Sequence, residues 1–374
     1  MERGAATMSK PIRTFLFAGL ISLVATGSSG ISLRQPAKAA ESFTIGENPP
    51  LSVMTYNING LPWPLATGRD VAMIEIARRL VAMRHAGRQP HIVLLQEAFT
   101  PEAAEIARSA GYAHAAFGPG ALTHSPITPT PDDAHFLKQP RWDRGEQVGK
   151  QVGSGLIILS DYPIERVDRM AFPDFACAGW DCLANKGVLI AHVRMPGSAA
   201  AVAVVNTHLN ARKAAGVPVS RSQRAYARQV ALIAQFVDAN VPDERALVIG
   251  GDMNIGTDSE RGKTFFDTFH SAGLDFVTAE ASGANIALRH TLVSGTSHHD
   301  LKQISRRKKD WIFARPATGE TIDVVRAHVP FGSRTADMPL SDHLGYVVAY
   351  SKLRAPSIQL AEADMMASRS GRVH

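Results

Sequence analysis

The chain has 374 residues, of which 45% are hydrophobic and 20% are charged. These fractions are ordinary for a globular protein, so they exclude a chain that is disordered throughout and a collagen-like chain. The length fits one large α/β domain or two small ones with an ample core. The formal net charge of +6 is weak evidence for nucleic-acid binding, because residues 1–39 contribute +4 of it.

The first 40 residues have the order of regions that is typical of a secretory signal peptide. Basic residues precede the apolar run FLFAGLISLVATG, and the small residues around Lys38 offer a cleavage position. An uncleaved membrane anchor is the alternative, and the shortness of the apolar run disfavours it. We therefore expect residues 1–40 to be a signal peptide, residues 41–352 to be one folded domain, and residues 353–374 to be a polar tail. The mature protein is then expected to be secreted or periplasmic.

Strand patterns outnumber helix patterns along the rest of the chain. Short apolar or β-branched runs predict strands at residues 51–57, 91–96, 153–160, 187–195, 201–209, 246–251, 310–315 and 343–350. Helix patterns cover residues 69–85, 100–111, 220–237 and 262–273. Because helices fall between only some of the strands, we expect a mixed, largely antiparallel α/β arrangement with helices packed outside the sheets.

Periodic apolar residues predict the buried faces of two of these helices. In the first helix they are Val71, Ile74, Ala77 and Val81. In the helix that follows residue 220 they are Tyr226, Val230, Ile233 and Val237. The string Ser-Arg-Ser-Gln at 220–223 predicts a capping box at the start of that second helix.

Two irregular stretches are candidates for loops that border a functional site. The string NGLPWPLATG follows the first strand and contains two prolines and Trp63. Residues 118–150 are rich in Pro, His and Gly and have no periodicity, and such long irregular segments in a domain are often functional. We expect both stretches to gate access to the site.

Cys177 and Cys182 are the two cysteines of the chain. Their spacing fits neither a zinc knuckle nor a Cys-x-x-Cys redox pair. In an oxidising compartment they would form a small disulfide loop, which we favour, and two free thiols are the alternative.

Polar residues stand where successive predicted strands begin or end. They are Asn57, Glu97, His208, Asp252, Asn254, Asp310, Asp342 and His343. Each alone has an ordinary explanation, such as a turn, a first-turn acid of a helix or a buried core histidine. Carboxylate and amide oxygens presented together suit a hard divalent cation and a phosphate group. If the last two strands run opposite to the others, all these groups meet along one edge of the sheets.

The strings that carry these residues resemble the endonuclease/exonuclease/phosphatase superfamily. TYNING, LLQE, NTHLNA, GDMN, an aspartate before an aromatic-apolar strand, and SDH follow in that superfamily's order, from Asn57 to His343. The superfamily includes DNase I-like nucleases, inositol polyphosphate 5-phosphatases and neutral sphingomyelinases. The resemblance implies a DNase I-like fold, which is a four-layer α/β/β/α sandwich with two mostly antiparallel central sheets. It also implies a site at one sheet edge for Mg²⁺, or alternatively for Mn²⁺ or Co²⁺.

Within the superfamily, the chain is most similar to the bacterial neutral sphingomyelinase branch. The string Asn-Gly-Leu-Pro at 59–62 resembles the opening of that branch. The string Asp-Cys-Leu-Ala-Asn-Lys-Gly at 181–187 and the string THLNA resemble two further segments of it.

The resemblance and the side-chain chemistry together imply a role for each residue. Glu97 and Asn57 are expected to hold the metal, with Asp342 as a further or second-metal ligand. His343 is the candidate general base, with Asp310 orienting its ring.

The remaining residues are expected to act on water and on the phosphate. Asp252 and Asn254 would position the attacking water and a phosphoryl oxygen, and His208 would donate a hydrogen bond to the phosphoryl group. Lys186 would add a positive charge on the substrate phosphate; a solvated lysine at the start of a strand is the alternative.

The function implied is a metal-dependent phosphodiesterase of the sphingomyelinase or phospholipase C type. We expect a monomer that acts on a phospholipid such as sphingomyelin and touches the membrane surface transiently. A DNase I-like endonuclease is the main alternative, because the basic string at 306–309 could follow a phosphate backbone. A sugar or inositol phosphate phosphatase is a further alternative, and a catalytically inactive binding protein on the same scaffold is a fourth.

Overall fold

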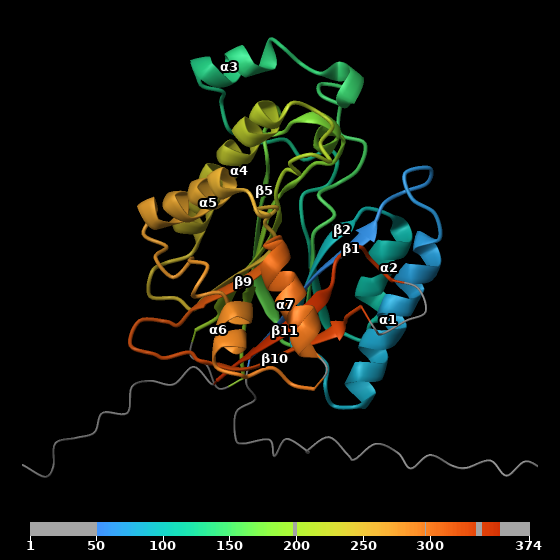
Figure 1. Ribbon diagram of the computed structural model, residues 1–374, viewed down its shortest axis with the longest axis vertical. Helices are drawn as coiled ribbons and strands as arrows, with labels where there is room; N and C mark the ends of the chain where they lie inside the picture. The colour runs from blue at the N-terminus through green and yellow to red at the C-terminus, as the bar shows by residue number, and fades with distance from the viewer. Residues whose placement is uncertain (1–50, 197–199, 296, 334–338, 352–374) are drawn as a thin grey trace, which may run out of the picture. The chain divides into compact units, whose positions relative to one another are not determined.

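The computed structural model describes residues 51–196, 200–295, 297–333 and 339–351 (Figure 1). The predicted signal peptide and the predicted polar tail lie outside the described residues. None of the helices in the described ranges is both long and apolar enough to cross a membrane.

The strands form two mixed sheets. In spatial order, the six-stranded sheet contains β10 (Val324–Phe331), β11 (Gly345–Tyr350), β1 (Ser52–Gly60), β2 (Ile92–Ala98), β4 (Ile157–Ser160) and β3 (His114–Phe117). The five-stranded sheet contains β5 (Ile164–Ala171), β6 (Gly187–Val193), β7 (Val202–His208), β8 (Leu247–Asp252) and β9 (Asp310–Arg315). The pairs β1–β2 and β7–β8 are parallel, and the other adjacent pairs are antiparallel.

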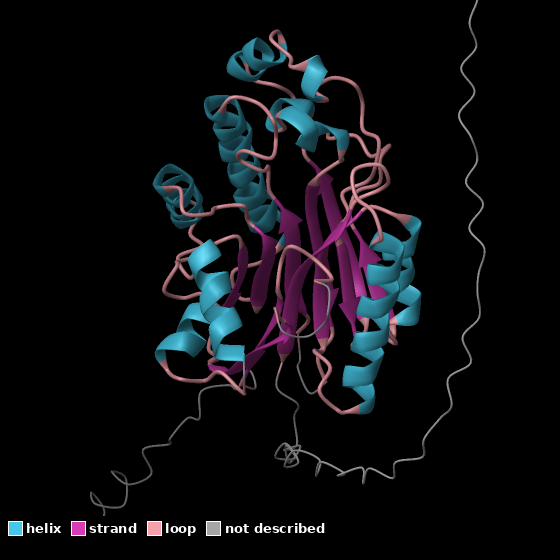
Figure 2. Ribbon diagram, turned by 45° about the vertical axis from the view of Figure 1, so that its right-hand side comes forward, coloured by secondary structure: helices cyan, strands magenta, loops and turns pink. Residues whose placement is uncertain are grey.

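Helices cover both outer faces of the sheets (Figure 2). The helices α1 (Arg69–His85) and α2 (Pro101–Ser109) bury apolar residues against β1, β2 and β4. The helices α4 (Val219–Asn240) and α5 (Ser259–Ser271) do the same against the five-stranded sheet. The short helix α6 (Gly283–Arg289) and α7 (Ser297–Arg307) pack on β9 and β10. This arrangement confirms the predicted α/β/β/α sandwich with mostly antiparallel sheets.

A core of fully buried aliphatic residues lies between the two sheets. Val53 of β1 and Leu94 of β2 share this cluster with Val204 of β7 and Val248 of β8. Because side chains alternate along a strand, residues two positions apart face the same way, so Asn57 points between the sheets as Val53 does. The packing of the two sheets therefore brings Asn57 of β1 close to the polar end of β8.

Gly251 allows β7 and β8 to approach closely just before the site. Its φ is 140°, and a Cβ atom there would lie 2.1 Å from the carbonyl oxygen of Thr207. No other residue type fits this position without displacing backbone. The glycine thus fixes the register that places His208 opposite Asp252 at the ends of the two strands.

The predicted buried face of α1 is wrong at two of its four positions. Val71 and Ile74 are each 67% exposed, whereas Ala77 is buried as predicted and Val81 is partly buried. The helix buries a stripe of Ala72, Met73, Ile76, Ala77 and Leu80. Both stripes have helical spacing, so periodicity did not distinguish them. Met73, Ile76 and Leu80 pack in one core cluster with apolar residues of β1 and β2. The predicted stripe of α4 is confirmed, since all four of its residues are buried.

The structure also differs from the prediction at the start of α4 and in residues 118–150. The helix α4 begins at Val219 after Pro218 and has no side-chain cap, so the capping box at 220–223 is wrong. Residues 118–150 are not structureless, because they contain α3 (Pro131–Leu137) and a 3₁₀ turn, η1 (Trp142–Arg144). A capping box closes the start of α3, with Thr130 and Asp133 bonded reciprocally.

Candidate active site at the edge of the two sheets

The strand ends meet as predicted. His208 and Asp252 are the last residues of β7 and β8, and Asp310 is the first residue of β9, directly opposite Asp252 in the register. The segment before β11 brings His343 to the same edge, because β11 runs antiparallel to β1. Asn57 differs from the prediction, since β1 continues to Gly60 and Asn57 lies within the strand.

Asn57 joins the two sheets at this edge. Its Nδ2 atom donates to Oε1 of Glu97 at 2.8 Å and to Oδ2 of Asp252 at 3.1 Å. Its side-chain oxygen accepts from the backbone nitrogen of Asn59 at 3.0 Å. In this arrangement the side-chain nitrogen of Asn57 donates hydrogen bonds to the carboxylates of Glu97 and Asp252 and positions them. Its role as a direct metal ligand stays a prediction.

Asp252 lies at the centre of the cluster and is almost completely buried. Its Oδ2 atom is 3.6 Å from Nε2 of His208 and 3.7 Å from Nε2 of His343. Burial acts to raise the pKa of Asp252, but nearby positive charge, above all that of His343, and the hydrogen bond from the backbone nitrogen of Asn254 outweigh it and hold the pKa below its ordinary value. Asp252 is therefore a charged carboxylate between two histidine rings.

His343 and Asp310 form a buried pair. The Nδ1 atom of His343 lies 2.9 Å from both carboxylate oxygens of Asp310. Burial acts against the charged ring, but the charges of Asp310 and Asp252 dominate and raise the pKa of His343 to about 9. Ser341 supports the loop, because its hydroxyl donates to the carbonyl oxygen of Asn57 at 2.7 Å and accepts from the backbone nitrogen of His343 at 3.1 Å.

Lys186 is buried beside His208, so the alternative of a solvated lysine is wrong. Its Nζ atom pairs with Asp181 and donates to the carbonyl oxygen of Leu209 at 3.2 Å. Nζ also lies 3.2 Å from Nε2 of His208. Because an ammonium group can only donate, Nε2 accepts in this contact and the ring proton is on Nδ1. Burial, reinforced by the charge of Lys186, lowers the pKa of His208 to about 3.

Glu97 and Asn254 have left-handed backbone conformations, with φ of 57° and 46°. Such conformations are costly for residues other than glycine and cluster at functional sites. Asn254 is held in place because its backbone nitrogen donates to Oδ1 of Asp252 at 3.0 Å and its Nδ2 to the carbonyl oxygen of Leu209 at 2.9 Å.

Asp342 is the predicted site residue that the structure does not bring into the cluster. Its side chain is exposed, while its backbone carbonyl accepts from Nη1 of Arg307 at 2.6 Å. The structure therefore places Asp342 at the rim of the site. Its role as a metal ligand stays a prediction.

The carboxylates fit a hard cation. Glu97 retains 19% side-chain exposure, and burial raises its pKa above the ordinary value although the hydrogen bond from Asn57 opposes this. Ligand atoms of Asp252, Asp310 and His343 lie within 4.8 Å of one another, close enough that these three side chains could hold one metal ion. Mg²⁺ is bound in proteins by one or two carboxylates together with waters and substrate phosphates. Glu97, joined to Asp252 through Asn57, adds a partly exposed carboxylate beside this group.

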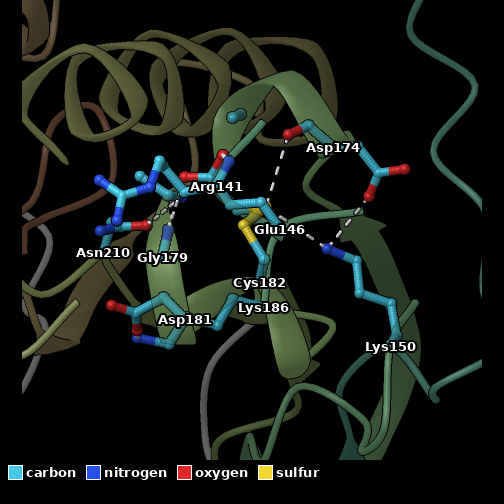
Figure 3. Close-up of a disulfide and its surroundings, with 12 residues drawn as sticks. Arg141, Glu146, Lys150, Asp174, Gly179, Asp181, Cys182, Lys186 and Asn210 are labelled. Atoms are coloured by element: carbon cyan, nitrogen blue, oxygen red, sulfur yellow. Dashed lines mark hydrogen bonds and ion pairs between the residues drawn. A yellow bond between two sulfur atoms is a disulfide. The ribbon is translucent and has the colours of Figure 1, made fainter. Parts of the chain in front are cut away.

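A disulfide lies in the segment just before Lys186 (Figure 3). Cys177 and Cys182 are bonded, which confirms the predicted bridge. The 3₁₀ turn η3 (Gly179–Leu183) contains Asp181, whose second oxygen accepts from the backbone nitrogen of Ala211 at 2.9 Å. Asp181 is a residue that sequence reasoning missed as part of the site, although it begins the string that contains Lys186.

A second residue that was missed is Arg69, at the start of α1. Its guanidinium donates to three backbone carbonyls, those of Ile58, Asn59 and Leu340, at 2.6 Å each. It therefore ties the end of β1 to the loop that leads to His343. No sequence motif marks this arginine, because its partners are backbone atoms far along the chain.

The profile of the endonuclease/exonuclease/phosphatase family matches residues 54–343. A curated sphingomyelinase of Mycobacterium bovis is 26% identical over 305 residues, which is 80% of this chain and 52% of that protein. The chain thus spans about half the length of the curated relatives it matches.

Solved structures show the same fold at lower identity. Sphingomyelinase C from Streptomyces griseocarneus has a TM-score of 0.50 and 20% identity, covering 80% of this chain and 99% of that chain. A beta toxin mutant from Staphylococcus aureus, solved with bound magnesium ions, has a TM-score of 0.50 and 18% identity, covering 81% of this chain and 100% of that chain. The family match extends from β1 to His343 and includes every residue of the cluster. The chain belongs to the endonuclease/exonuclease/phosphatase family.

Proposed function

We propose that the protein is a Mg²⁺-dependent phosphodiesterase of the sphingomyelinase or phospholipase C type. The observation that carries this proposal is the convergence of the His343–Asp310 pair on Asp252, with Glu97 joined to the same carboxylate through Asn57. This set provides a base, a group that orients it and oxygen ligands within one edge of the sheets. The similarity to sphingomyelinases supports a choline phospholipid as substrate.

His343 activates the attacking water. Its Nδ1 atom is engaged by Asp310, so Nε2 is the ring nitrogen that takes the proton. Asp310 and Asp252 stabilise the resulting imidazolium, and Asp252 with Asn254 orients the water. The same ring can later return the proton to the leaving alkoxide, directly or through solvent.

Lys186 and His208 act on the phosphoryl group. The ammonium group of Lys186 lies beside His208 and can move its hydrogen bond from that ring to a phosphoryl oxygen. Once Lys186 no longer donates to Nε2, the other neutral tautomer of His208, which has its proton on Nε2, can act as a second donor to the phosphoryl group. Mg²⁺, held by Glu97 and its neighbours, would supply charge neutralisation to the phosphate.

The remaining proposals concern the localisation of the protein, its substrate and its metal ion. The order of regions in residues 1–40 supports secretion or a periplasmic location. The substrate is a membrane phospholipid such as sphingomyelin, and the enzyme acts as a monomer with transient contact to the membrane surface. Mn²⁺ and Co²⁺ are alternative ions for the same oxygen ligands.

A panel of substrates tests the proposal. Sphingomyelin, phosphatidylcholine, plasmid DNA and inositol phosphates are assayed side by side with Mg²⁺, and each reaction has a control with EDTA. We expect release of phosphocholine that EDTA abolishes and that His343→Ala removes. Cleavage of plasmid DNA without release of phosphocholine would instead establish the endonuclease alternative, and release of inorganic phosphate would establish a phosphatase.

A further inference from the structure

The helix α7 has a basic face that the proposed chemistry does not use. His299, Lys302 and Arg306 are exposed and spaced three and four residues apart, so they lie on one side of the helix. Leu301 and Ile304 are buried on the opposite side. We call the exposed set, continued by Lys308 and Lys309 after the helix, the basic face.

The positive charges of the basic face have no ion-pair partner in the described ranges, although the charge of Lys309 acts on the buried Asp252. Among the residues that the structure describes, Lys302, Arg306, Lys308 and Lys309 form no ion pair, whereas most other arginines of the protein do. The net charge of the chain outside residues 1–39 is only about +2, so this concentration of positive charge is local. A local group of unpaired cations indicates an anionic partner.

The basic face adjoins the active site and lines a groove. The carbonyl oxygens of Lys308 and Lys309 accept from the backbone nitrogens of Gly256 and Met253, at 2.9 Å and 2.7 Å, so the loop after Asp252 is bonded to it. A groove of about 510 Å³ lies beside α7, and Thr257 of that loop lines it together with Lys302, Gln303 and Arg306. An anion bound there lies next to the catalytic edge.

An exposed apolar loop stands at the same edge. We call residues 61–68 the Trp63 loop. Trp63 is 81% exposed and Leu65 is 68% exposed, and each follows a proline, which limits the motion of the backbone. Large apolar side chains presented this way bury their surface only when a partner covers them.

The basic face and the Trp63 loop are tied to one short segment. Arg69, directly after the Trp63 loop, donates to the carbonyl oxygen of Leu340, and Arg307, at the end of α7, donates to that of Asp342, each at 2.6 Å. Only Ser341 stands between Leu340 and Asp342 in the chain, and His343 follows directly after Asp342. The apolar loop and the cationic face are therefore both joined to the segment that precedes His343.

We propose that the basic face and the Trp63 loop together bind the surface of a bilayer that contains anionic phospholipids. Lysine and arginine attract the negative surface, and tryptophan and leucine enter the interfacial region, which is the usual combination in peripheral membrane proteins. A nucleic acid offers phosphates to the basic face, but it gives Leu65 no apolar environment. The inference rests on the proposed function, since a lipid substrate brings this edge to a membrane.

Binding in the absence of turnover tests the inference. The full chain is sedimented in EDTA with phosphatidylcholine vesicles that contain or lack phosphatidylserine, at several salt concentrations. We expect Lys302→Gln/Arg306→Gln to weaken binding to the anionic vesicles about 30-fold at low salt and to flatten the salt dependence. The control Arg78→Gln/Arg108→Gln removes the same charge from two exposed surface pairs on α1 and α2, and it should change binding less than about twofold.

The apolar part is tested in the same assay. Trp63→Ala/Leu65→Ala should weaken binding to both kinds of vesicle, whereas Val325→Ala, which shortens an exposed apolar side chain on β10, should not. Thermal melting of each variant establishes that it is folded.

The inference is overturned if the α7 variant binds anionic vesicles as the control does, or if it loses affinity for plasmid DNA and not for vesicles. The proposed function fails separately, if the wild-type protein binds vesicles but hydrolyses none of their lipids in Mg²⁺.

Discussion

The Nδ1 atom of His343 lies 2.9 Å from both carboxylate oxygens of Asp310, although the two residues are 33 positions apart. Asp310 begins a strand of the five-stranded sheet, and His343 precedes a strand of the six-stranded sheet. The pair is therefore made only when the two sheets are packed. It leaves Nε2 directed towards Asp252, where a water can be deprotonated.

The first prediction is that His343 and Asp310 act as one unit. Asp310→Asn and His343→Ala should each lower kcat by about 10³- to 10⁴-fold, because a base without its orienting carboxylate loses its tautomer and charge stabilisation. The double variant should be little worse than the poorer single variant, since losses from cooperating residues are not additive. Steady-state kinetics on all four proteins measure this, and two multiplicative losses would show that the residues act independently.

The second prediction concerns the titration of the two histidines without metal. In EDTA the ring of His343 should titrate near pH 9, and that of His208 should stay neutral down to about pH 3. Asp310→Asn should move the pKa of His343 downwards, because it removes the largest favourable charge. Proton NMR of the imidazole signals follows both rings.

Because the pKa of His343 is raised, the stability of the metal-free protein should depend on pH. Because the pKa of His343 is raised from 6.5 to about 9 on folding, its pair with Asp310 stabilises the metal-free fold fully below about pH 6.5. That contribution is lost as pH rises through about 9. Urea unfolding at several pH values should show the loss in wild type and not in His343→Ala, and an equal loss in both proteins would refute it.

The third prediction separates the roles of the histidines. His208→Ala should lower kcat by about 10²- to 10³-fold, which is the usual effect of one lost transition-state donor. It should leave the rising alkaline limb of the pH–rate profile in place, whereas His343→Ala should erase it. The reverse result would assign the base to His208.

The fourth prediction concerns Lys186 and Asp181. Lys186→Met leaves the buried carboxylate of Asp181 without its partner and should cost about 3–5 kcal/mol of stability. Adding Asp181→Asn should recover most of the stability but none of the activity, because the charge near the phosphate is still missing. If the double variant regains turnover, Lys186 is structural only.

Much of the site was predictable because its residues stand at the ends of strands with strong apolar patterns. The motif GGDMN placed Asp252 and Asn254, and the antiparallel direction of the last strands brought Asp310 and His343 to the same edge. Those positions follow from local sequence and from the pairing of neighbouring strands.

The orientations of the side chains were not predictable. The sequence does not show that the side-chain nitrogen of Asn57 donates to two carboxylates. It also does not show that Lys186 is buried beside His208 or that Asp342 faces solvent. These depend on partners that are 20 to 200 positions away and on the packing of the two sheets. For the same reason periodicity misplaced Val71 and Ile74 of α1, which are exposed, because two stripes with helical spacing compete there and tertiary packing decides between them.

The dependence of turnover on free Mg²⁺, measured for wild type and Glu97→Gln side by side, tests the central claim most directly. Wild type should show saturable activation in phosphocholine release. Glu97→Gln should lose nearly all turnover at limiting Mg²⁺ while keeping its melting temperature in EDTA, because the change removes the anionic ligand and little of the packing. Glu75→Gln, at an exposed surface pair, is the matched control and should behave as wild type does. Near-wild-type turnover by Glu97→Gln at limiting Mg²⁺ would contradict the account.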